Sequence, residues 1–331
     1  MPDLPTRVLV TGAGGPAGVA VIRSLQRRSG VVVLAADMDR WASGLYLVPA
    51  GSRHLVPPGL AEEFVDVVVE LCARERVDVV FSTVDVELPR LAAERARLDE
   101  LGAVLAAPSL ETLETCLDKY ALAQRTRGSV RAPRTELLGA VDPAGWTYPV
   151  IVKPRRGAGS RGVSLVPDAA SLMALGADVD WLVQEELPGE EFSVDTLVDV
   201  DGRVVAAVPR SRVRVDSGVS VAGVTVRDPE LVEVAAQVAA AIGLVGVANI
   251  QLRRDVEGRP ALLEVNPRFP GSLPLTIAAG VDLPSLALDL ALGRPLPERV
   301  EHRELAVVRY LEDVFLPAAE LVLARTTGVP A

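Results

Sequence analysis

Apolar and polar positions follow two alternating periods in the first third of the chain. Short runs rich in β-branched residues have the composition of buried strands, and they occupy residues 7–12, 31–37, 77–84 and 103–108. Two intervening segments, residues 60–76 and 87–101, repeat apolar residues at the three- and four-residue spacing of a helix. Strands that alternate with helices are typical of a parallel, doubly wound sheet. We therefore expect residues 1–108 to form an open α/β domain.

The pattern changes after this segment. Residues 109–126 predict a helix with Ser109 as its N-cap. Short strands separated by Gly- and Pro-containing turns follow, and long strands, a helix, a hairpin and C-terminal helices are predicted from residue 188 onward. We therefore expect two further units of α+β character, residues 109–187 and 188–331.

The composition indicates a globular protein whose partners are small molecules. The chain has 331 residues, of which 49% are hydrophobic and 24% charged, and its net charge is −10. An acidic chain is a poor partner for nucleic acid or an anionic membrane, although a local basic pocket for a phosphorylated ligand remains allowed. No apolar run approaches the ~20 residues of a membrane span, and the N-terminus lacks the pattern of a signal peptide. We expect no nucleic-acid partner, no membrane partner and a cytoplasmic location.

The cysteines and histidines form no recognisable site in the sequence. Cys72 and Cys116 lack the spacing of zinc ligands or of a disulfide framework, and His54 and His302 are far apart along the chain. We therefore expect neither a zinc site nor a Cys/His nucleophile.

The glycine-rich turn of residues 12–18 permits two interpretations. Gly12, Gly14 and Ala17 follow a strand and open a helix, and Asp37 ends the next strand, as in the fingerprint of dinucleotide-binding domains. In that case the glycines would approach a pyrophosphate and the carboxylate would bind a ribose. The same strand, turn and helix also serve as a scaffold only. An NAD(P)-dependent oxidoreductase is therefore one alternative, and features in the rest of the chain have to distinguish it from a scaffold role of the turn.

Lysine is almost absent from this chain. Among its 34 basic residues, only Lys119 and Lys153 are lysines. A lysine ammonium is a compact charge that fits against nucleotide phosphates where a planar guanidinium does not. Lys153 also ends a strand-like run and precedes a loop with three glycines, whose backbone N–H groups can approach an anion closely. These features favour a phosphate site; chance survival of the lysines and an ordinary turn are the alternatives.

Residues 247–269 predict a β-hairpin that carries three oxygen ligands. Glu264 and Asn266 are two residues apart on a strand, so they point to the same face. A turn centred between residues 257 and 258 sets Gln251 opposite Glu264, whereas a slip of one residue would turn Gln251 to the other face. Mg²⁺ binds few carboxylates and takes its other ligands from nucleotide and water. The hairpin therefore predicts a metal site, with incidental surface polar residues as the alternative.

Five features occur in a specific order along the chain: Lys119, the "VIVKP" strand with its glycine loop, and the segments "VQEELPGEEFSVD", "NIQL" and "LEVNPR". Together they resemble the ATP-grasp superfamily, and most closely the single-core relatives of the carbamoyl phosphate synthetase large chain. The resemblance covers nearly the whole chain. It implies a Rossmann-like pre-ATP-grasp domain followed by a two-lobed ATP-grasp core. It also implies that the glycine turn is a scaffold and lines one wall of an acceptor cleft.

The resemblance implies which residues bind ATP. Lys119 and Lys153 would be the phosphate-side and adenine-side lysines, and the loop from 156 to 162 would close over the phosphates. The hinge after the "VQEEL" strand would meet the adenine edge through its backbone, and Glu191 would bind the ribose hydroxyls. The implied ATP-binding set is Lys119, Lys153, Arg156, Gly157, Ser160, Gly162, Glu185, Glu186, Leu187, Glu191 and Gln251.

The metal ligands and the catalytic residues are implied in the same way. Gln251, Glu264 and Asn266 match the divalent-metal ligands of the superfamily. An acidic residue more often stands at the position of Gln251, but the carbamoyl phosphate synthetase branch has glutamine there. Arg268 matches the arginine that steadies the transferred phosphoryl group, and it forms the catalytic set together with Lys153.

The substrate residues are less defined by the sequence. Arg210, Arg212 and Arg214 alternate along one strand, which fits either a clamp for a carboxylate or a solvated face. Ser272 lies just beyond the metal strand and is expected to face the substrate. The candidate substrate residues are Arg212, Arg214 and Ser272.

The resemblance implies an ATP-dependent carboxylate–amine ligase. ATP would activate a carboxylate as an acyl phosphate and an amine would then displace phosphate, so that no protein nucleophile is needed. The implied cofactors are ATP and Mg²⁺ (or Mn²⁺), the partners are a small-molecule carboxylate and an amine, and a homodimer is an allowed assembly. A Rossmann oxidoreductase and a nucleotide-binding module without catalysis are the alternatives.

Overall fold

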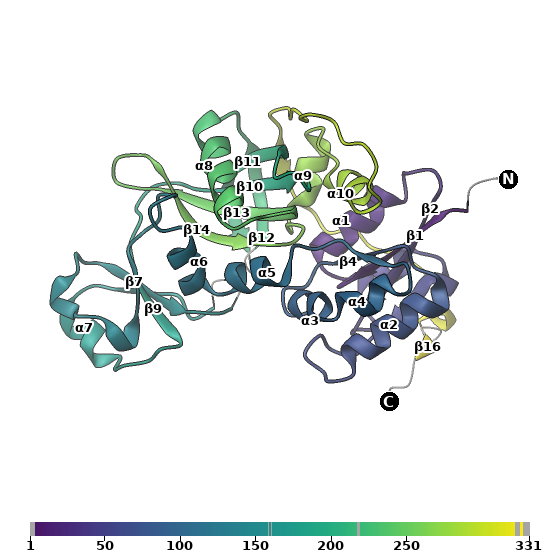
Figure 1. Ribbon diagram of the computed structural model, residues 1–331, viewed down its shortest axis with the longest axis horizontal. Helices are drawn as coiled ribbons and strands as arrows, with labels where there is room; N and C mark the ends of the chain where they lie inside the picture. Colours follow the sequence, from purple (N-terminus) through teal and green to yellow (C-terminus); the bar gives the residue numbers. More distant parts are fainter. Residues whose placement is uncertain (1–3, 158, 160, 217–218, 322–324, 327–331) are drawn as a thin grey trace.

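Three β-sheets organise the chain, and short helices lie between and around them (Figure 1). The computed structural model describes residues 4–157, 159, 161–216, 219–321 and 325–326. Within these ranges, no helix is both long enough and apolar enough to cross a membrane.

The N-terminal sheet is a parallel sheet of six strands, which confirms the predicted doubly wound α/β fold. Its order is β16-β3-β2-β1-β4-β5, so the strand order reverses between β1 and β4. The strands are β1 (Thr6–Thr11), β2 (Val31–Asp37), β3 (Arg53–Leu55), β4 (Val79–Ser82), β5 (Val104–Leu105) and β16 (Arg325–Thr326). The helices are α1 (Pro16–Leu25), α2 (Phe64–Glu75), α3 (Leu88–Ala93) and α4 (Arg95–Asp99). In open sheets of this kind, ligands bind where the order reverses, at the carboxyl ends of the strands.

The C-terminal end of the chain returns to this first sheet, which the sequence did not predict. Strand β16 pairs in parallel with β3 and forms the edge of the first sheet (Figure 1).

A second sheet of four antiparallel strands projects from the body of the molecule (Figure 1). Its order is β6-β9-β7-β8, and it carries the glycine loop between β7 and β8. The strands are β6 (Thr135–Leu137), β7 (Val150–Pro154), β8 (Ser164–Val166) and β9 (Trp181–Glu185), and helix α7 (Ala169–Ala174) follows β8. Helices α5 (Leu110–Leu117) and α6 (Lys119–Arg125) join this sheet to the N-terminal domain.

The third sheet is antiparallel and has the order β14-β13-β10-β11-β12-β15. Its strands are β10 (Glu191–Val198), β11 (Val204–Asp216), β12 (Val219–Thr225), β13 (Gly246–Arg254), β14 (Pro260–Asn266) and β15 (Ala306–Val308). Helix α8 (Pro229–Ala241) packs on one face. Helices α9 (Leu273–Ala278) and α10 (Leu283–Ala291) pack against α1.

The first and third sheets share one apolar core, which fixes their relative position. The cluster contains Val8 and Val10 of β1 together with Leu197 of β10 and Phe269 after β14. The ring of Phe269 meets that of Phe81 on β4 edge to face, with centroids 5.3 Å apart. The segment after β14 is therefore anchored directly on β4.

Two predicted helices are each divided in the structure. Residues 109–126 form α5 and α6, because Asp118 takes an extended conformation and its carboxylate caps α6. The segment 87–101 likewise forms α3 and α4, with the break at Glu94. Ser109 is confirmed as the N-cap of α5, since its side chain accepts a hydrogen bond from the Thr112 N–H group.

Candidate functional site

A cavity of about 1170 Å³ lies where all three parts of the chain meet. The N-terminal domain contributes the segment after β4, and helices α5 and α6 contribute a second wall. The β7–β8 loop and the end of β14 complete the lining. A volume of this size accommodates a nucleotide together with a small molecule.

Lys119 lies at the first position of α6 and reaches into this cavity. Its ammonium donates a hydrogen bond of 2.8 Å to the carbonyl oxygen of Gly157 in the glycine loop. The same ammonium is 4.0 Å from the carboxylate of Glu264. Lys119 therefore brings together two segments that the sequence marked independently, the glycine loop and the hairpin.

Asp118 positions Lys119, a role that the sequence analysis missed. Its carboxylate accepts hydrogen bonds of 3.1 Å from the N–H groups of Tyr120 and Ala121, which caps the helix. It also receives Arg155 Nε at 2.8 Å and Arg156 Nη2 at 3.2 Å from the glycine loop. Burial alone would raise the pKa of Asp118, but the Arg155 and Ala121 hydrogen bonds outweigh it and lower that pKa. An aspartate directly before a helical run was the sequence signal for this cap.

Lys153 is buried in β7, and it is not among the described residues that line the cavity, although the next residue, Pro154, is. Burial lowers the pKa of its ammonium to about 8. The nearby carboxylates of Glu264 and Glu191 oppose this effect, while the charge of Lys119 adds to it. The two lysines of the chain therefore act on one another electrostatically, which is typical of a site that binds a polyanion.

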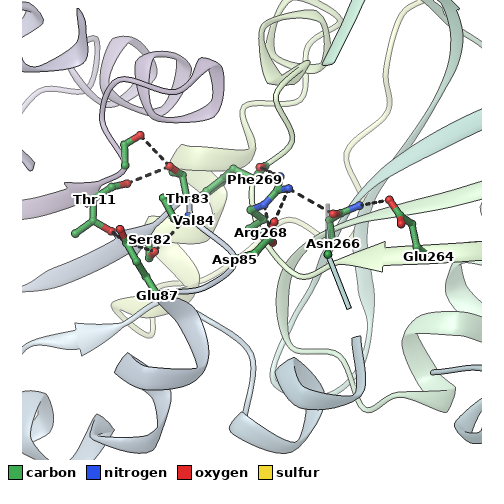
Figure 2. Close-up of polar contacts among 12 residues, drawn as sticks. Thr11, Ser82, Thr83, Val84, Asp85, Glu87, Glu264, Asn266, Arg268 and Phe269 are labelled. Atoms are coloured by element: carbon green, nitrogen blue, oxygen red, sulfur yellow. Dashed lines mark hydrogen bonds and ion pairs between the residues drawn. The ribbon is translucent and has the colours of Figure 1, made fainter. Parts of the chain in front are cut away.

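The hairpin has the predicted register. Gln251 on β13 pairs with Glu264 on β14, and a β-bulge follows directly after Gln251. Asn266 donates a hydrogen bond of 3.3 Å to Glu264, so the two side chains share one face, as Figure 2 shows. The register prediction is therefore confirmed.

The donor set of the hairpin fits a hard cation that is shared with a nucleotide. It offers one carboxylate, from Glu264, and the side-chain amide oxygens of Gln251 and Asn266. In the part of the chain that the structure describes, no group of three or more His, Cys, Asp and Glu residues could hold a metal ion. Mg²⁺ suits such a sparse set because it keeps water and phosphate ligands.

Arg268 is held by a carboxylate that the sequence analysis did not identify. Its Nε and Nη2 donate to the two oxygens of Asp85, at 2.7 and 2.8 Å (Figure 2). Nη2 also lies 3.4 Å from the side-chain oxygen of Asn266. The guanidinium therefore bridges the N-terminal domain and the hairpin. A carboxylate just after β4, at the point where the strand order reverses, was the available signal.

The segment that carries Asp85 is fixed by a buried polar cluster, shown in Figure 2. The carboxylate of Glu87 accepts hydrogen bonds from the hydroxyls of Thr11 and Ser82. Burial raises the pKa of Glu87, and these two hydrogen bonds oppose that effect. Thr83 donates to the backbone oxygens of Thr11 and Gly12, at 3.0 and 3.1 Å. The ends of β1 and β4 are thereby tied together.

The glycine loop has the backbone that its composition predicts. Gly157, Gly159 and Gly162 have φ angles of 133°, 71° and 74°, which L-residues rarely adopt. A Cβ atom at Gly162 would lie only 2.9 Å from Pro154 Cγ. Ser160, which belongs to the predicted ATP-binding set, lies outside the described residues.

The hinge and ribose candidates are not among the described residues that line the cavity, and two of them have protein partners. Glu185 exchanges hydrogen bonds with Arg134, through its N–H group at 2.9 Å and its carboxylate at 3.1 Å. Glu186 is half-buried beside Leu187, which is buried. The carboxylate of Glu191 forms an ion pair of 2.8 Å with Arg212.

The arginines of β11 do not form one uniform face. Arg210 is buried and donates two hydrogen bonds of 2.8 Å to Asp195, so it is neither solvated nor open to a substrate carboxylate. Register shifts around Arg214 interrupt the expected alternation, and Arg214 is exposed. Ser272 is buried directly before α9.

The glycine turn of residues 12–18 does not line the cavity, contrary to the expectation that it forms an acceptor wall. Among the described lining residues, the N-terminal domain contributes Leu60 and the segment after β4 instead. The carboxylate of Asp37 accepts a hydrogen bond of 2.8 Å from the Gly14 N–H group. A Cβ atom at Gly14 would lie 2.6 Å from that of Ala42. The space and the carboxylate that a dinucleotide requires are therefore used by the protein itself.

Two family models match separate parts of the chain. Residues 8–106 match the PylC-like N-terminal domain. Residues 177–314 match the model described as ATP-grasp in the biosynthetic pathway with Ter operon.

Individual relatives agree with these matches. The carbamoyl phosphate synthase arginine-specific large chain of Geobacillus stearothermophilus is 25% identical over 284 residues, which cover 81% of this chain and 26% of that protein. A D-alanine–D-alanine ligase of Gloeobacter violaceus is 32% identical over 163 residues, covering 42% of this chain and 53% of that one. The chain thus spans about a quarter and about half of the length of these two relatives.

A solved structure shows the same fold. N5-carboxyaminoimidazole synthetase from Staphylococcus aureus, complexed with ADP, superposes with a TM-score of 0.73 at 14% identity, covering 91% of this chain and 80% of that chain. The sequence motifs, the three sheets and these matches agree. The chain combines a segment that matches a PylC-like N-terminal domain with a segment that matches an ATP-grasp domain, and its homologues include carbamoyl phosphate synthase large chains and D-alanine–D-alanine ligases.

Proposed function

We propose that this protein is an ATP-dependent ligase that activates a carboxylate as an acyl phosphate and couples it to an amine. The observation that carries the proposal is the arrangement of charged and polar groups in and beside one cavity. Lys119 and the glycine loop line it beside Glu264 and Asn266, and Lys153 interacts electrostatically with Glu264. Arg268 lies against the same hairpin. The relatives that carry names of ligases and synthetases support this reaction class.

In the first step, a carboxylate oxygen of the substrate attacks the γ-phosphorus of ATP, and the bond from that phosphorus to the ADP oxygen breaks. Lys119 and Lys153 bind the phosphates, and the glycine loop covers them. Glu264, Gln251 and Asn266 would hold Mg²⁺, which neutralises phosphate charge when bound. Arg268 offers a planar fork to the phosphoryl oxygens, whose charge changes most in the transition state.

In the second step, the amine nitrogen attacks the carbonyl carbon of the acyl phosphate. The bond from that carbon to the phosphate oxygen breaks, phosphate leaves, and the amine loses a proton. No side chain forms a covalent bond with the substrate. The buried Cys72 and Cys116 are consistent with this scheme, because burial raises the pKa of each thiol to about 12.

The two alternatives are less well supported. An NAD(P)-dependent oxidoreductase needs the glycine turn and Asp37, and the contacts of Gly14 with Asp37 and Ala42 occupy both. A binding module without catalysis would not need Glu264, Asn266 and Arg268 arranged along one hairpin and its continuation.

The proposal is tested by a screen of carboxylate and amine pairs for ADP release, followed by mass spectrometry of the products. Calorimetry on the same protein should detect binding of Mg-ATP and Mg-ADP and none of NAD(H) or NADP(H). Tight nicotinamide binding without adenine-nucleotide binding would overturn the ligase assignment.

A further inference from the structure

Asp85 and Arg268 form a bidentate pair that the proposed reaction must open. Both oxygens of Asp85 accept hydrogen bonds from Arg268, and both side chains remain 20% exposed. In the proposed reaction the same guanidinium contacts the transferred phosphoryl group. A partly exposed ion pair costs little to exchange, because each partner can regain solvent or another ion.

The fold places Asp85 at this position independently of Arg268. Asp85 follows β4 at the reversal of strand order, and the hydrogen bonds of Thr83 and Glu87 hold its segment on both sides. The contact of Phe81 with Phe269 anchors the segment of Arg268 on the same strand. When Arg268 turns toward a phosphoryl group, Asp85 therefore stays at the cavity wall as a carboxylate without its cation.

Three cations line the cavity from the start of α6 and from the β7–β8 loop. They are Lys119, Arg156 and Arg161, and Arg156 is paired with Asp118. These three cations surround the position proposed for the nucleotide phosphates.

Acidic side chains line the cavity as well. They include Asp85 after β4, and Glu111 and Glu114, which are exposed on α5. Arg90 also lies here, but its guanidinium donates to backbone oxygens, including those of Gly59 and Glu62. Asp85, Glu111 and Glu114 therefore give an acidic character to the lining that the segment after β4 and α5 contribute, and this lining favours a cationic group.

Exposed apolar side chains line the same cavity as these carboxylates. Leu60 and Val86 line the cavity with 75% and 44% of their surface exposed, and Val84 and Pro89 lie beside them. A molecule that binds here can cover exposed apolar side chains while its charged group contacts Asp85.

Resting on the proposed ligase function, we propose that Asp85 binds the ammonium group of the acceptor amine, and that this amine carries an apolar substituent. The ammonium takes the place of the Arg268 guanidinium on the carboxylate of Asp85, and it gives up one proton to solvent before the neutral nitrogen attacks the acyl phosphate. Arg268 is thereby released toward the phosphoryl group that is transferred. Binding of the amine therefore exchanges one cation for another on Asp85, and the same exchange makes Arg268 available to the phosphoryl group.

The test uses n-hexylamine, which is an ammonium ion at neutral pH, and 1-hexanol, which has the same apolar chain without the charge. Each is titrated by calorimetry into the full-length protein saturated with Mg-ADP. We expect the wild type to bind hexylammonium at least about tenfold more tightly than hexanol, since a hydrogen bond to a charged group is involved. D85N should bind both equally.

A matched variant controls for general charge. Asp99, at the end of α4, is exposed on the same domain and does not line the cavity. D99N should keep the full preference for hexylammonium. D85E, which retains the charge, should keep part of it, and melting curves of all three variants show whether each is folded.

The outcomes separate this proposal from the ligase assignment. Equal binding of the two probes to the wild type, or an unchanged preference in D85N, would overturn the role of Asp85. A lowered melting temperature of D85N with an unchanged preference would show that the pair is only a clamp between domains. Failure to bind Mg-ADP would instead contradict the proposed function.

Discussion

The ammonium of Lys119 lies 4.0 Å from the carboxylate of Glu264, across the join between α6 and the β13–β14 hairpin. It also donates a hydrogen bond to the Gly157 carbonyl oxygen, so that one side chain links the hairpin to the glycine loop. A cation placed between the carboxylate proposed as a metal ligand and the loop proposed to cover the phosphates has the position that a nucleotide with its metal would require. The predictions below test the groups around this link.

Replacement of Glu264 by glutamine should remove the dependence of activity on divalent metal and reduce turnover at least about 100-fold, the upper range for weakened metal sites. The substitution keeps the shape of the side chain, so the melting temperature should stay close to that of the wild type. Initial rates measured over a range of Mg²⁺ concentrations check this expectation. Glu257→Gln, in the turn of the same hairpin, should behave as the wild type, and normal metal dependence in Glu264→Gln would rule out the metal assignment.

Lys153 should take up a proton when nucleotide binds near pH 8. Burial lowers its pKa to about 8, and phosphate charge beside the ammonium would raise that pKa again. Titration of Mg-ADP in buffers of different ionisation enthalpy measures the uptake. Lys153→Met should abolish it and weaken nucleotide binding about tenfold or more, since a contact to a charged phosphate is lost. An identical proton uptake in the variant would place the titrating group elsewhere.

Lys153 should also make the free energy of unfolding depend on pH. Its pKa is about 8 in the folded protein and 10.5 in an unfolded chain, so the unfolded state binds more protons between these values. The free energy of unfolding should therefore gain a contribution that increases as the pH rises from about 8 to 10.5. Urea unfolding of the wild type and of Lys153→Met across this window should differ in slope in that direction.

The sequence predicted the parts of the site that depend on local pattern. The register of Gln251 with Glu264 follows from a two-residue period and a short turn, and the hairpin of β7 and β8 follows from strand composition and glycines. The doubly wound sheet follows from alternating periods. The register and the hairpin are each determined within one short continuous segment of the chain, and the sheet is predicted from the succession of such segments.

The partners of the charged residues could not be predicted in this way. Asp85 and Arg268 are 183 positions apart, and their contact depends on how the first and third sheets pack on a shared core. Arg210 looked equivalent to Arg214 in the sequence, but burial beside Asp195 and the register shifts in β11 separate them. Long-range packing decides such pairs, and a single sequence contains no direct signal of it.

Replacement of Asp118 by alanine should raise the KM for ATP as well as lower stability. The cap of α6 is worth about 1 kcal/mol, and the same carboxylate holds Arg155 and Arg156 at the start of the glycine loop. Asp168→Ala is the matched control, because Asp168 caps α7 through the Ser171 N–H group and does not line the cavity. The control should lose similar stability and keep its KM. Equal KM values in the two variants would show that Asp118 acts only as a cap.

Lowering the pH should decrease the stability of the fold through protonation of Asp118. Its pKa is lowered in the folded protein, so the unfolded state binds more protons as the pH falls below the usual range of aspartate. Its stabilising contribution is therefore present above about pH 4 and is lost as the pH decreases through the lower, folded value. Asp118→Ala should show a smaller decrease in melting temperature between pH 5 and pH 3 than the wild type.

Arg268 should matter more for rate than for nucleotide binding. Its guanidinium is held against Asp85 and Asn266, and in the proposed reaction it meets charge that is greater in the transition state than in bound ATP. Arg268→Ala should therefore lose about 10² to 10³ in turnover, with little change in the dissociation constant of ATP. Lysine at this position should restore activity only in part, because it supplies the charge without the fork.

Melting temperature distinguishes this role from a structural one. The pair with Asp85 is partly exposed, and such pairs contribute about 1 kcal/mol or less, so the melting temperature of Arg268→Ala should fall by only a few degrees. Neighbouring Phe269 is buried in the core shared by the two sheets and offers a contrast. Phe269→Ala should cost about 3 to 5 kcal/mol and impair nucleotide binding through the fold. If Arg268→Ala behaved like Phe269→Ala, with unfolding and weakened ATP binding together, Arg268 would be a packing residue and the reaction centre would have to lie elsewhere in the cavity.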